Sequence, residues 1–230
     1  MIEILALGIL LGLQHALEAD HLAAMATLAS DGGSLGAVAR RGVAWGIGHS
    51  LTLLALGGTA LLLGTLIPPQ MASLLEFAVG LMLVLLGADV LRRLRSTRSR
   101  PPRCLHDGAP GAARQCDRER RPERQRPAPA FPVRALCVGM LHGMAGSAAL
   151  VLLTLQTARS PAEGLTYIAL FGAGSILGMG VLGALIGLPL GWTARAAAGT
   201  ARGLNVLIGC ASAALGLWLM YSTGIVAVRG

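Results

Sequence analysis

Residues 204–220 read LNVLIGCASAALGLWLM, a segment without a charged side chain. Two further segments, 51–67 and 77–91, are nearly as apolar. Each approaches the length of about 20 residues that a helix needs to cross the hydrocarbon core of a membrane. The chain as a whole is 54% hydrophobic and 13% charged, whereas soluble domains are about 25% charged. These features predict an all-α integral membrane protein.

Apolar windows along the rest of the chain extend this prediction to six transmembrane helices. Between the third and fourth windows, residues 96–132 hold seven of the 11 Pro and almost no aliphatic run, so we expect a disordered loop there. The chain then divides into a first three-helix unit, 1–95, the loop 96–132, and a second three-helix unit, 133–230. The predicted spans lie near 3–29, 42–66, 72–94, 133–157, 164–190 and 202–226.

The formal charge of +8 is concentrated in one part of the chain. All 19 basic residues are Arg, and 13 of them lie between 92 and 134. A basic charge confined to one loop argues against a DNA-binding domain, so no nucleic-acid partner is expected. The absence of Lys excludes a Walker A loop, which needs its Lys. We therefore expect a protein that is neither an ATPase nor another enzyme.

The same arginines predict the orientation of the chain in the membrane. The connections near 30–41, 92–134 and 191–203 contain 17 of the 19 Arg. Because Arg-rich connections stay on the cytoplasmic side, both termini should lie outside, in a multi-pass protein of the cytoplasmic (inner) membrane.

Three blocks of the first half recur in the second half in the same order. GLQH, residues 12–15, matches GMLH, residues 139–142, and WGIGH, residues 45–49, matches FGAGS, residues 171–175. Because each unit has three helices, the two copies must have opposite orientations, which is a common plan for secondary transporters with a site where the halves meet. The third block places Glu76, Gly80 and Gly87 opposite Asn205, Gly209 and Gly216 at identical spacing.

Polar side chains interrupt the predicted spans at a few positions. The first span contains HALEADH, residues 15–21, and the second and fourth contribute His49 and His142. Carboxylates inside a membrane must be protonated, be paired with a cation or border water. Since no Arg lies at a helix centre, imidazoles beside carboxylates predict a metal ion as the missing partner.

On a straight helix, Asp20 would lie about 140° and His21 about 240° around from His15. We therefore expect local unwinding of this helix, or coordination by only some of these residues.

These motifs resemble those of the nickel/cobalt permease family. The H-x4-D-H run of residues 15–21 is similar to that family's signature, and GHSLT, residues 48–52, to its second motif. The block LHGMAGSA, residues 141–148, resembles the short, urease-accessory-type members. The resemblance covers the six predicted helices and not the loop. Longer permeases commonly have eight helices, and many have Asp at the position of Glu18.

The resemblance implies a secondary transporter that carries Ni²⁺ or Co²⁺ as its substrate, with no cofactor. The expected direction of transport is import along the membrane potential. The expected partners are the lipid bilayer and the nickel-enzyme maturation proteins that would receive the metal. Efflux of the same ions and, less favoured, a membrane metalloenzyme are the alternatives. The expected metal ligands are His15, Asp20, His21, His49 and His142. The residues expected to support them or line the ion path are Glu18, Glu76, Ser50, Ser147 and Asn205.

Overall fold

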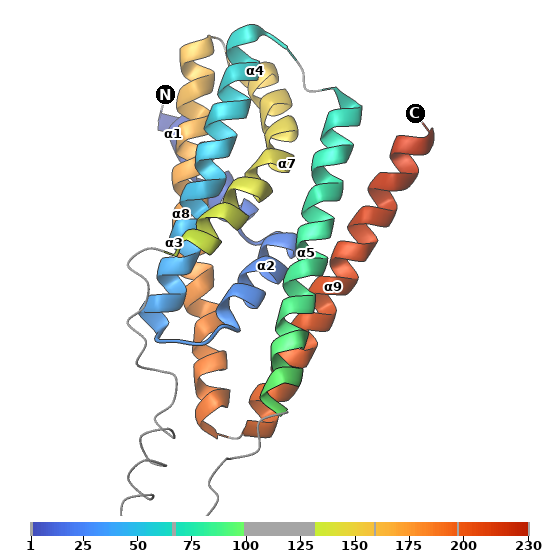
Figure 1. Ribbon diagram of the computed structural model, residues 1–230. Helices are drawn as coiled ribbons and strands as arrows, with labels where there is room; N and C mark the ends of the chain where they lie inside the picture. Colours follow the sequence, from blue (N-terminus) through green and yellow to red (C-terminus); the bar gives the residue numbers. More distant parts are fainter. Residues whose placement is uncertain (1, 66–67, 99–131, 159, 197, 230) are drawn as a thin grey trace, which may run out of the picture.

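The computed structural model describes residues 2–65, 68–98, 132–158, 160–196 and 198–229, which fold mainly into helices (Figure 1). The helices are α1 (Ile2–His15), α2 (Ala19–Ala29), α3 (Leu35–Thr52), the π-helical segment η1 (Leu53–Gly57), α4 (Gly58–Leu63), α5 (Pro69–Arg98), α7 (Val133–Thr157), α8 (Pro161–Ala196) and α9 (Ala198–Arg229).

Within the part of the chain that the structure describes, four helical segments are long and apolar enough to cross a membrane, by length and composition. They are 35–63, 69–96, 161–193 and 199–224, and they correspond to the second, third, fifth and sixth predicted spans. The fourth predicted span, 133–157, coincides with α7. These helices fit a multi-pass membrane protein, and six crossings stay a prediction. The predicted loop 96–132 lies almost wholly outside the described residues.

The first predicted span, 3–29, is not one continuous helix. Helix α1 ends at His15, and the next residues form a tight turn in which the Leu17 and Glu18 N–H groups donate to the carbonyls of Gln14 and His15 at 2.9 and 3.1 Å. Glu18 then takes an extended conformation, with ψ at 150°, and α2 starts at Ala19. The local unwinding expected from the spacing of His15, Asp20 and His21 is therefore confirmed.

Helices of the first half pack mainly against helices of the second half. The main pairs are α1 with α8, α3 with α7, α3 with α8, and α5 with α9. Glycines allow the close approach in these pairs. A Cβ atom at Gly12 would lie 2.1 Å from the carbonyl oxygen of Phe171, and one at Gly139 would lie 2.0 Å from that of Trp45. Gly12 and Gly139 are matched positions in the sequence blocks, and so are Phe171 and Trp45, so the two halves make corresponding contacts.

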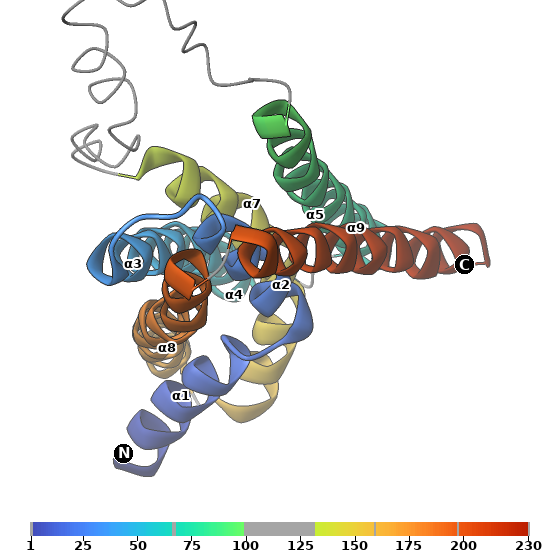
Figure 2. The same ribbon diagram turned by 90° about the horizontal axis from the view of Figure 1, so that it is seen from below.

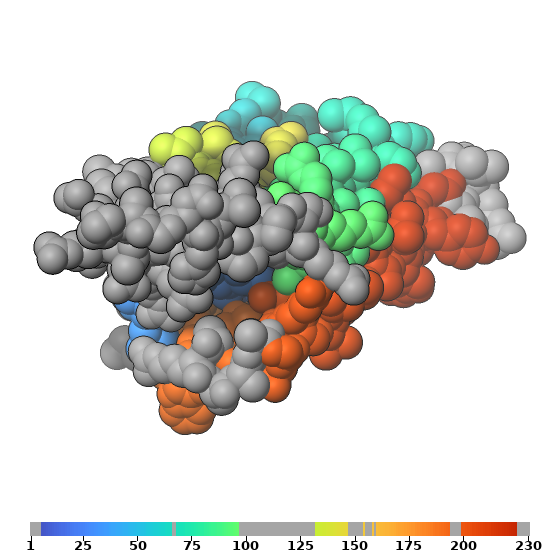
Figure 3. Space-filling model, turned by 60° about the horizontal axis from the view of Figure 1, so that its bottom comes forward, coloured from blue at the N-terminus to red at the C-terminus, as the bar shows by residue number. Residues whose placement is uncertain are grey.

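The pair α5–α9 shows the same reciprocity. Gly80 meets the carbonyl of Gly216, and Gly87 meets that of Gly209, so the two helices run antiparallel. Figure 2 shows this pair extending to one side of the other helices, with α2 between the two groups. Figure 3 shows α9 running beside α5 toward one edge of the molecule. The arrangement places the short helix α2 in the middle of the protein.

Candidate metal site

The break between α1 and α2 brings the histidines of the first motif together. His15 is the last residue of α1, and Asp20 and His21 lie in the first turn of α2. A carboxylate in the first turn of a helix is stabilised by the helix dipole. With the chain unwound between them, the side chains of His15 and His21 approach each other, with ring centroids 4.4 Å apart.

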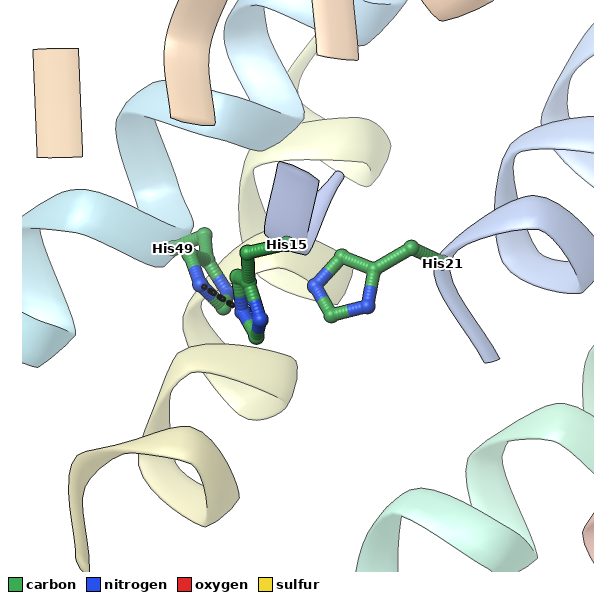
Figure 4. A group of neighbouring side chains, drawn as sticks. All are labelled: His15, His21 and His49. Carbon is green, nitrogen blue, oxygen red and sulfur yellow. Dashed lines mark hydrogen bonds between the residues drawn. The ribbon is translucent and has the colours of Figure 1, made fainter. Parts of the chain in front are cut away.

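His49 of α3 completes a group of three imidazoles, which we call the histidine triad (Figure 4). The Nε2 atoms of His15 and His49 are 3.2 Å apart. Each of the three residues offers one nitrogen, and these nitrogens lie within 4.8 Å of one another. Three converging nitrogens from three helices form a set that could hold one metal ion.

Asp20 joins the triad to the second half of the chain. Its Oδ1 atom is 2.9 Å from Nδ1 of His21, and its Oδ2 atom is 3.0 Å from Nε2 of His142 on α7. Asp20, His21 and His142 form a second three-donor group that shares His21 with the triad. The carboxylate therefore orients both rings, and Nε2 of His21 has no hydrogen-bond partner among the described residues.

Glu18 has the same relation to His15. Its Oε1 atom lies 2.8 Å from Nδ1 of His15. A carboxylate bonded to the far ring nitrogen of a ligating histidine fixes the tautomer and makes the near nitrogen a better ligand. Glu18 and Asp20 therefore occupy the Nδ1 atoms of His15 and His21. A metal ion in the triad could bind their Nε2 atoms and would replace the present hydrogen bond between Nε2 of His15 and Nε2 of His49.

The site is buried although its groups are polar. His21, His49 and His142 are 1%, 0% and 2% exposed. Within the described residues, Nε2 of His21, Nδ1 of His49 and Nδ1 of His142 are buried and have no hydrogen-bond partner. Buried polar atoms are nearly always satisfied in native proteins, and a metal ion in the triad would satisfy Nε2 of His21.

A pocket of about 420 Å³ gives access to the triad. The charged groups among its described lining residues are all acidic, so the pocket favours a cation. Its lining consists of His15, Glu18, Asp20, His21, His49, Glu76, Val79, His142, Ala145, Gly146, Phe171 and Leu219.

The pocket brings together most of the residues expected at the site. The five expected ligands all line it, as do Glu18 and Glu76. Ser50 instead donates a hydrogen bond to the carbonyl of Gly172 at 2.9 Å and so ties α3 to α8. Asn205 is on α9, where its Oδ1 atom is buried without a hydrogen-bond partner among the described residues. The side chain of Ser147 lies outside the described part of the chain.

Sequence reasoning missed two aromatic residues beside the histidines. Trp45, 0% exposed, packs against His21 and His142 with ring centroids at 5.3 and 5.6 Å. Phe171 packs against His15 at 5.1 Å. The signal was present, since Trp45 and Phe171 occupy matched positions in the recurring blocks.

Comparison with known proteins finds a relative along nearly the whole chain. The sequence is 37% identical over 228 residues, or 98% of this chain and 93% of the relative, to the urease accessory protein UreH of Bacillus sp. (strain TB-90). No protein-family model matches the sequence, and no solved structure matches it. The identity with UreH shows that the chain belongs to the urease accessory protein UreH family, which confirms its resemblance to the urease-accessory-type members of the nickel/cobalt permease family.

Proposed function

We propose that this protein carries Ni²⁺, or Co²⁺, across the cytoplasmic membrane into the cell. The observation that carries the proposal is the convergence of His15, His21 and His49 inside an apolar helical protein, with Asp20 behind them. Ionisable groups in membrane helices are costly and mark ion pathways.

The donor chemistry fits a borderline transition metal. Imidazole nitrogen suits Ni²⁺ and Co²⁺, whereas Mg²⁺ and Ca²⁺ prefer oxygen ligands. The Nε2 atoms of His15 and His49 are 3.2 Å apart. Two nitrogens at that separation, each about 2.1 Å from one ion, subtend an angle of about 100° at the ion. That angle lies between the values for square-planar and tetrahedral coordination, so small movements of the rings would serve either geometry.

The charge of the site also fits a dication. Asp20 and Glu18 carry two negative charges at the far nitrogens of His21 and His15. An ion of charge +2 in the triad would be balanced by them, without an anion entering the membrane with it. Neutral imidazoles alone would leave two uncompensated charges in a region where charge is expensive.

Import needs no ATP and no cofactor besides the transported ion. A dication that moves inward along a potential of about 100 mV gains about 4.6 kcal/mol. This energy supports accumulation by more than three orders of magnitude, since each tenfold step costs about 1.4 kcal/mol. A uniporter driven by the potential is therefore sufficient.

The proposed architecture is six membrane crossings in two inverted three-helix repeats, with both termini outside. The reciprocal contacts of Gly12 with Phe171 and of Gly139 with Trp45 support it, because a two-fold relation between the halves requires them. The site lies where α1, α2 and α3 of one half meet α7 and α8 of the other, which is the usual place in such transporters.

The name of the relative suggests where the metal goes. UreH is called a urease accessory protein, and we propose that the imported Ni²⁺ reaches the proteins that mature a nickel enzyme.

The test is uptake of radioactive nickel and cobalt by cells with and without the gene. Expression should raise accumulation, and Asp20→Asn and His21→Ala should each abolish nearly all of the increase at equal membrane expression. Glu163→Gln, which alters an acidic residue at the start of α8, serves as the matched control and should leave uptake unchanged. Uptake like that of the parent in both site variants would refute the metal site. Lower accumulation with the gene than without it would indicate efflux.

A further inference from the structure

Opposite charges meet at the end of the molecule away from Glu76. We call Asp31, Asp89, Arg93 and Arg134 the ion-pair cluster. Arg134 bonds to Asp89 at 2.8 Å and contacts Asp31 at 3.4 Å, and Arg93 pairs with both aspartates. Asp31 follows α2, Asp89 and Arg93 lie on α5, and Arg134 lies on α7. The cluster therefore ties three helices together at one end.

An apolar layer separates this cluster from the histidines. Along α2, buried Met25 and Leu28 lie between His21 and Asp31. Along α5, buried Leu83 and Leu86 come between the pocket residue Val79 and Asp89, and along α7, buried Val138 comes between Arg134 and His142. These apolar residues belong to one packed core, to which Met179 and Leu182 of α8 also contribute. Along each of the three helices, the apolar layer thus lies between the histidine site and the charged residues of the cluster.

The exposed acidic residues of the pocket lie on the opposite side of the histidines from the cluster. Glu18, with its side chain 55% exposed, and Glu76, also exposed, lie in its lining. Glu76 lies near the start of α5 and Leu219 near the end of α9, whereas Asp89 and Arg93 lie near the end of α5. Since α5 and α9 are antiparallel, both lining residues are on the side away from the cluster. The exposed part of the pocket lining therefore lies on the side away from the cluster, and the packed apolar core lies between the triad and the cluster.

We propose that the ion-pair cluster is the gate of the ion path at this closed end, and that its pairs must separate before the ion can leave the triad in that direction. The proposal rests on the proposed transport function. The arginine distribution predicts that this end faces the cytoplasm, so the structure is the state that receives ions from outside. The arginines of the cluster are about half exposed, at 44% and 45%. Ion pairs so exposed are individually weak, so the cluster can open in every transport cycle.

The two halves of the protein differ at this point. At the spacing of the matched Gly80 and Gly209, the counterpart of Asp89 is Trp218. At the spacing of Gly12 and Gly139, the counterpart of Arg134 is Leu7. Both counterparts are apolar and exposed, at 62% and 50%. The ion pairs involving Asp89 and Arg134 therefore have no equivalent at the other end, and the difference favours the state that is closed at the cluster.

Cross-linking across the cluster tests the gate. In a variant with its four cysteines replaced by Ser, Asp31→Cys and Arg93→Cys place one thiol after α2 and one on α5. The variant is reconstituted in vesicles and treated with a short, reducible bifunctional thiol reagent. We expect uptake of radioactive nickel to fall at least tenfold and to recover on reduction, while nickel binding by the same protein in detergent is unchanged. The variant with Arg93→Cys alone, treated identically, is the control.

The outcomes separate the gate from the transport function. Full cross-linking with undiminished uptake would overturn the gate and leave the transport function intact. A protein that neither binds nor takes up nickel before treatment would overturn the transport function and the gate with it.

A second measurement needs no cross-link. A thiol placed in the apolar layer by Leu86→Cys is treated with a maleimide added from the cytoplasmic side. Its reaction should be several-fold faster when Arg93→Gln is also present. Arg95→Gln, an exposed arginine two residues further along α5, should not change this rate. Equal rates in all three proteins would also overturn the gate.

Discussion

Asp20 and His142 are 122 residues apart in the sequence and 3.0 Å apart in the structure, from Oδ2 to Nε2. Through this bond, helix α2 of the first half and helix α7 of the second orient one another's ligands. Because Oδ1 of the same carboxylate accepts from His21, one side chain links the histidine triad to the opposite half of the protein.

Glu18→Gln should lower the apparent affinity for nickel without abolishing transport. The amide can still accept a hydrogen bond from Nδ1 of His15, but it no longer supplies a negative charge beside the ion. Loss of such a group weakens metal affinity by about ten- to a hundredfold. The measurement is the concentration dependence of initial uptake, in which the half-saturating concentration should rise more than the maximal rate falls. An unchanged half-saturating concentration would show that the charge of Glu18 does not contribute to ion binding.

His49→Ala should weaken nickel binding more mildly than His21→Ala. His49 contributes one nitrogen to the triad, whereas His21 belongs to both three-donor groups. Equilibrium binding of radioactive nickel to the purified protein measures both effects. Equal loss of nickel affinity in the two variants would show that membership of both three-donor groups does not make His21 more important for binding than His49.

Gly139→Ala should destabilise the protein. The new methyl group would lie 2.0 Å from the carbonyl oxygen of Trp45, so α7 and α3 would have to move apart. Overpacking of this kind typically costs about 1–3 kcal/mol. Thermal unfolding in detergent should show a lower midpoint for this variant. Gly203→Ala, where a Cβ atom meets nothing within 4 Å, is the control and should leave the midpoint unchanged or raise it.

Deletion of residues 104–126 should leave nickel uptake within a factor of a few of the parent. The stretch is rich in Pro and Arg and poor in apolar residues, so we expect it to hold no essential ligand. Complete loss of uptake, with the shortened protein still present in the membrane, would give the loop a part in binding or assembly.

Reporter fusions at Arg98 and Gly230 should lie in opposite compartments, with Arg98 in the cytoplasm. The prediction follows from the arginines of the connecting segments. Enzymatic reporters that are active on only one side of the membrane provide the measurement. The same compartment for both fusions would contradict the six crossings and the inverted repeats together.

Much of the fold could be predicted from apolar windows, because a membrane requires long uncharged helices. The windows fail where helices continue into water. Helix α3 starts at Leu35, seven residues before its window, because Arg40 and Arg41 dilute the apolar signal there. Ser34 marks the true start, since its hydroxyl accepts a hydrogen bond from the N–H of Ala37 at 3.3 Å. Capping residues therefore locate this helix end better than hydropathy does.

The core of the candidate site could also be predicted, because charged and imidazole groups are conspicuous among aliphatic residues. The angles around a helix made local unwinding the expected arrangement, but they did not give the position of the break after His15. The partners of each group could not be derived in this way. Ser50 looked like a path residue, yet its hydroxyl is used in a contact with Gly172 that depends on how closely α3 and α8 approach. Such contacts are set by packing between distant segments, which a single sequence does not reveal.

The position of Trp45 gives the protein its own optical reporter of occupancy. Of the three tryptophans, Trp192 and Trp218 are 67% and 62% exposed, whereas Trp45 is fully buried against His21 and His142. A Ni²⁺ or Co²⁺ ion in the triad would lie close to the indole of Trp45 and quench its fluorescence through its partly filled d shell. Quenchers dissolved in the surrounding lipid or detergent would suppress mainly the two exposed tryptophans. Emission that survives such quenchers therefore reports, in the unlabelled protein, whether an ion occupies the site.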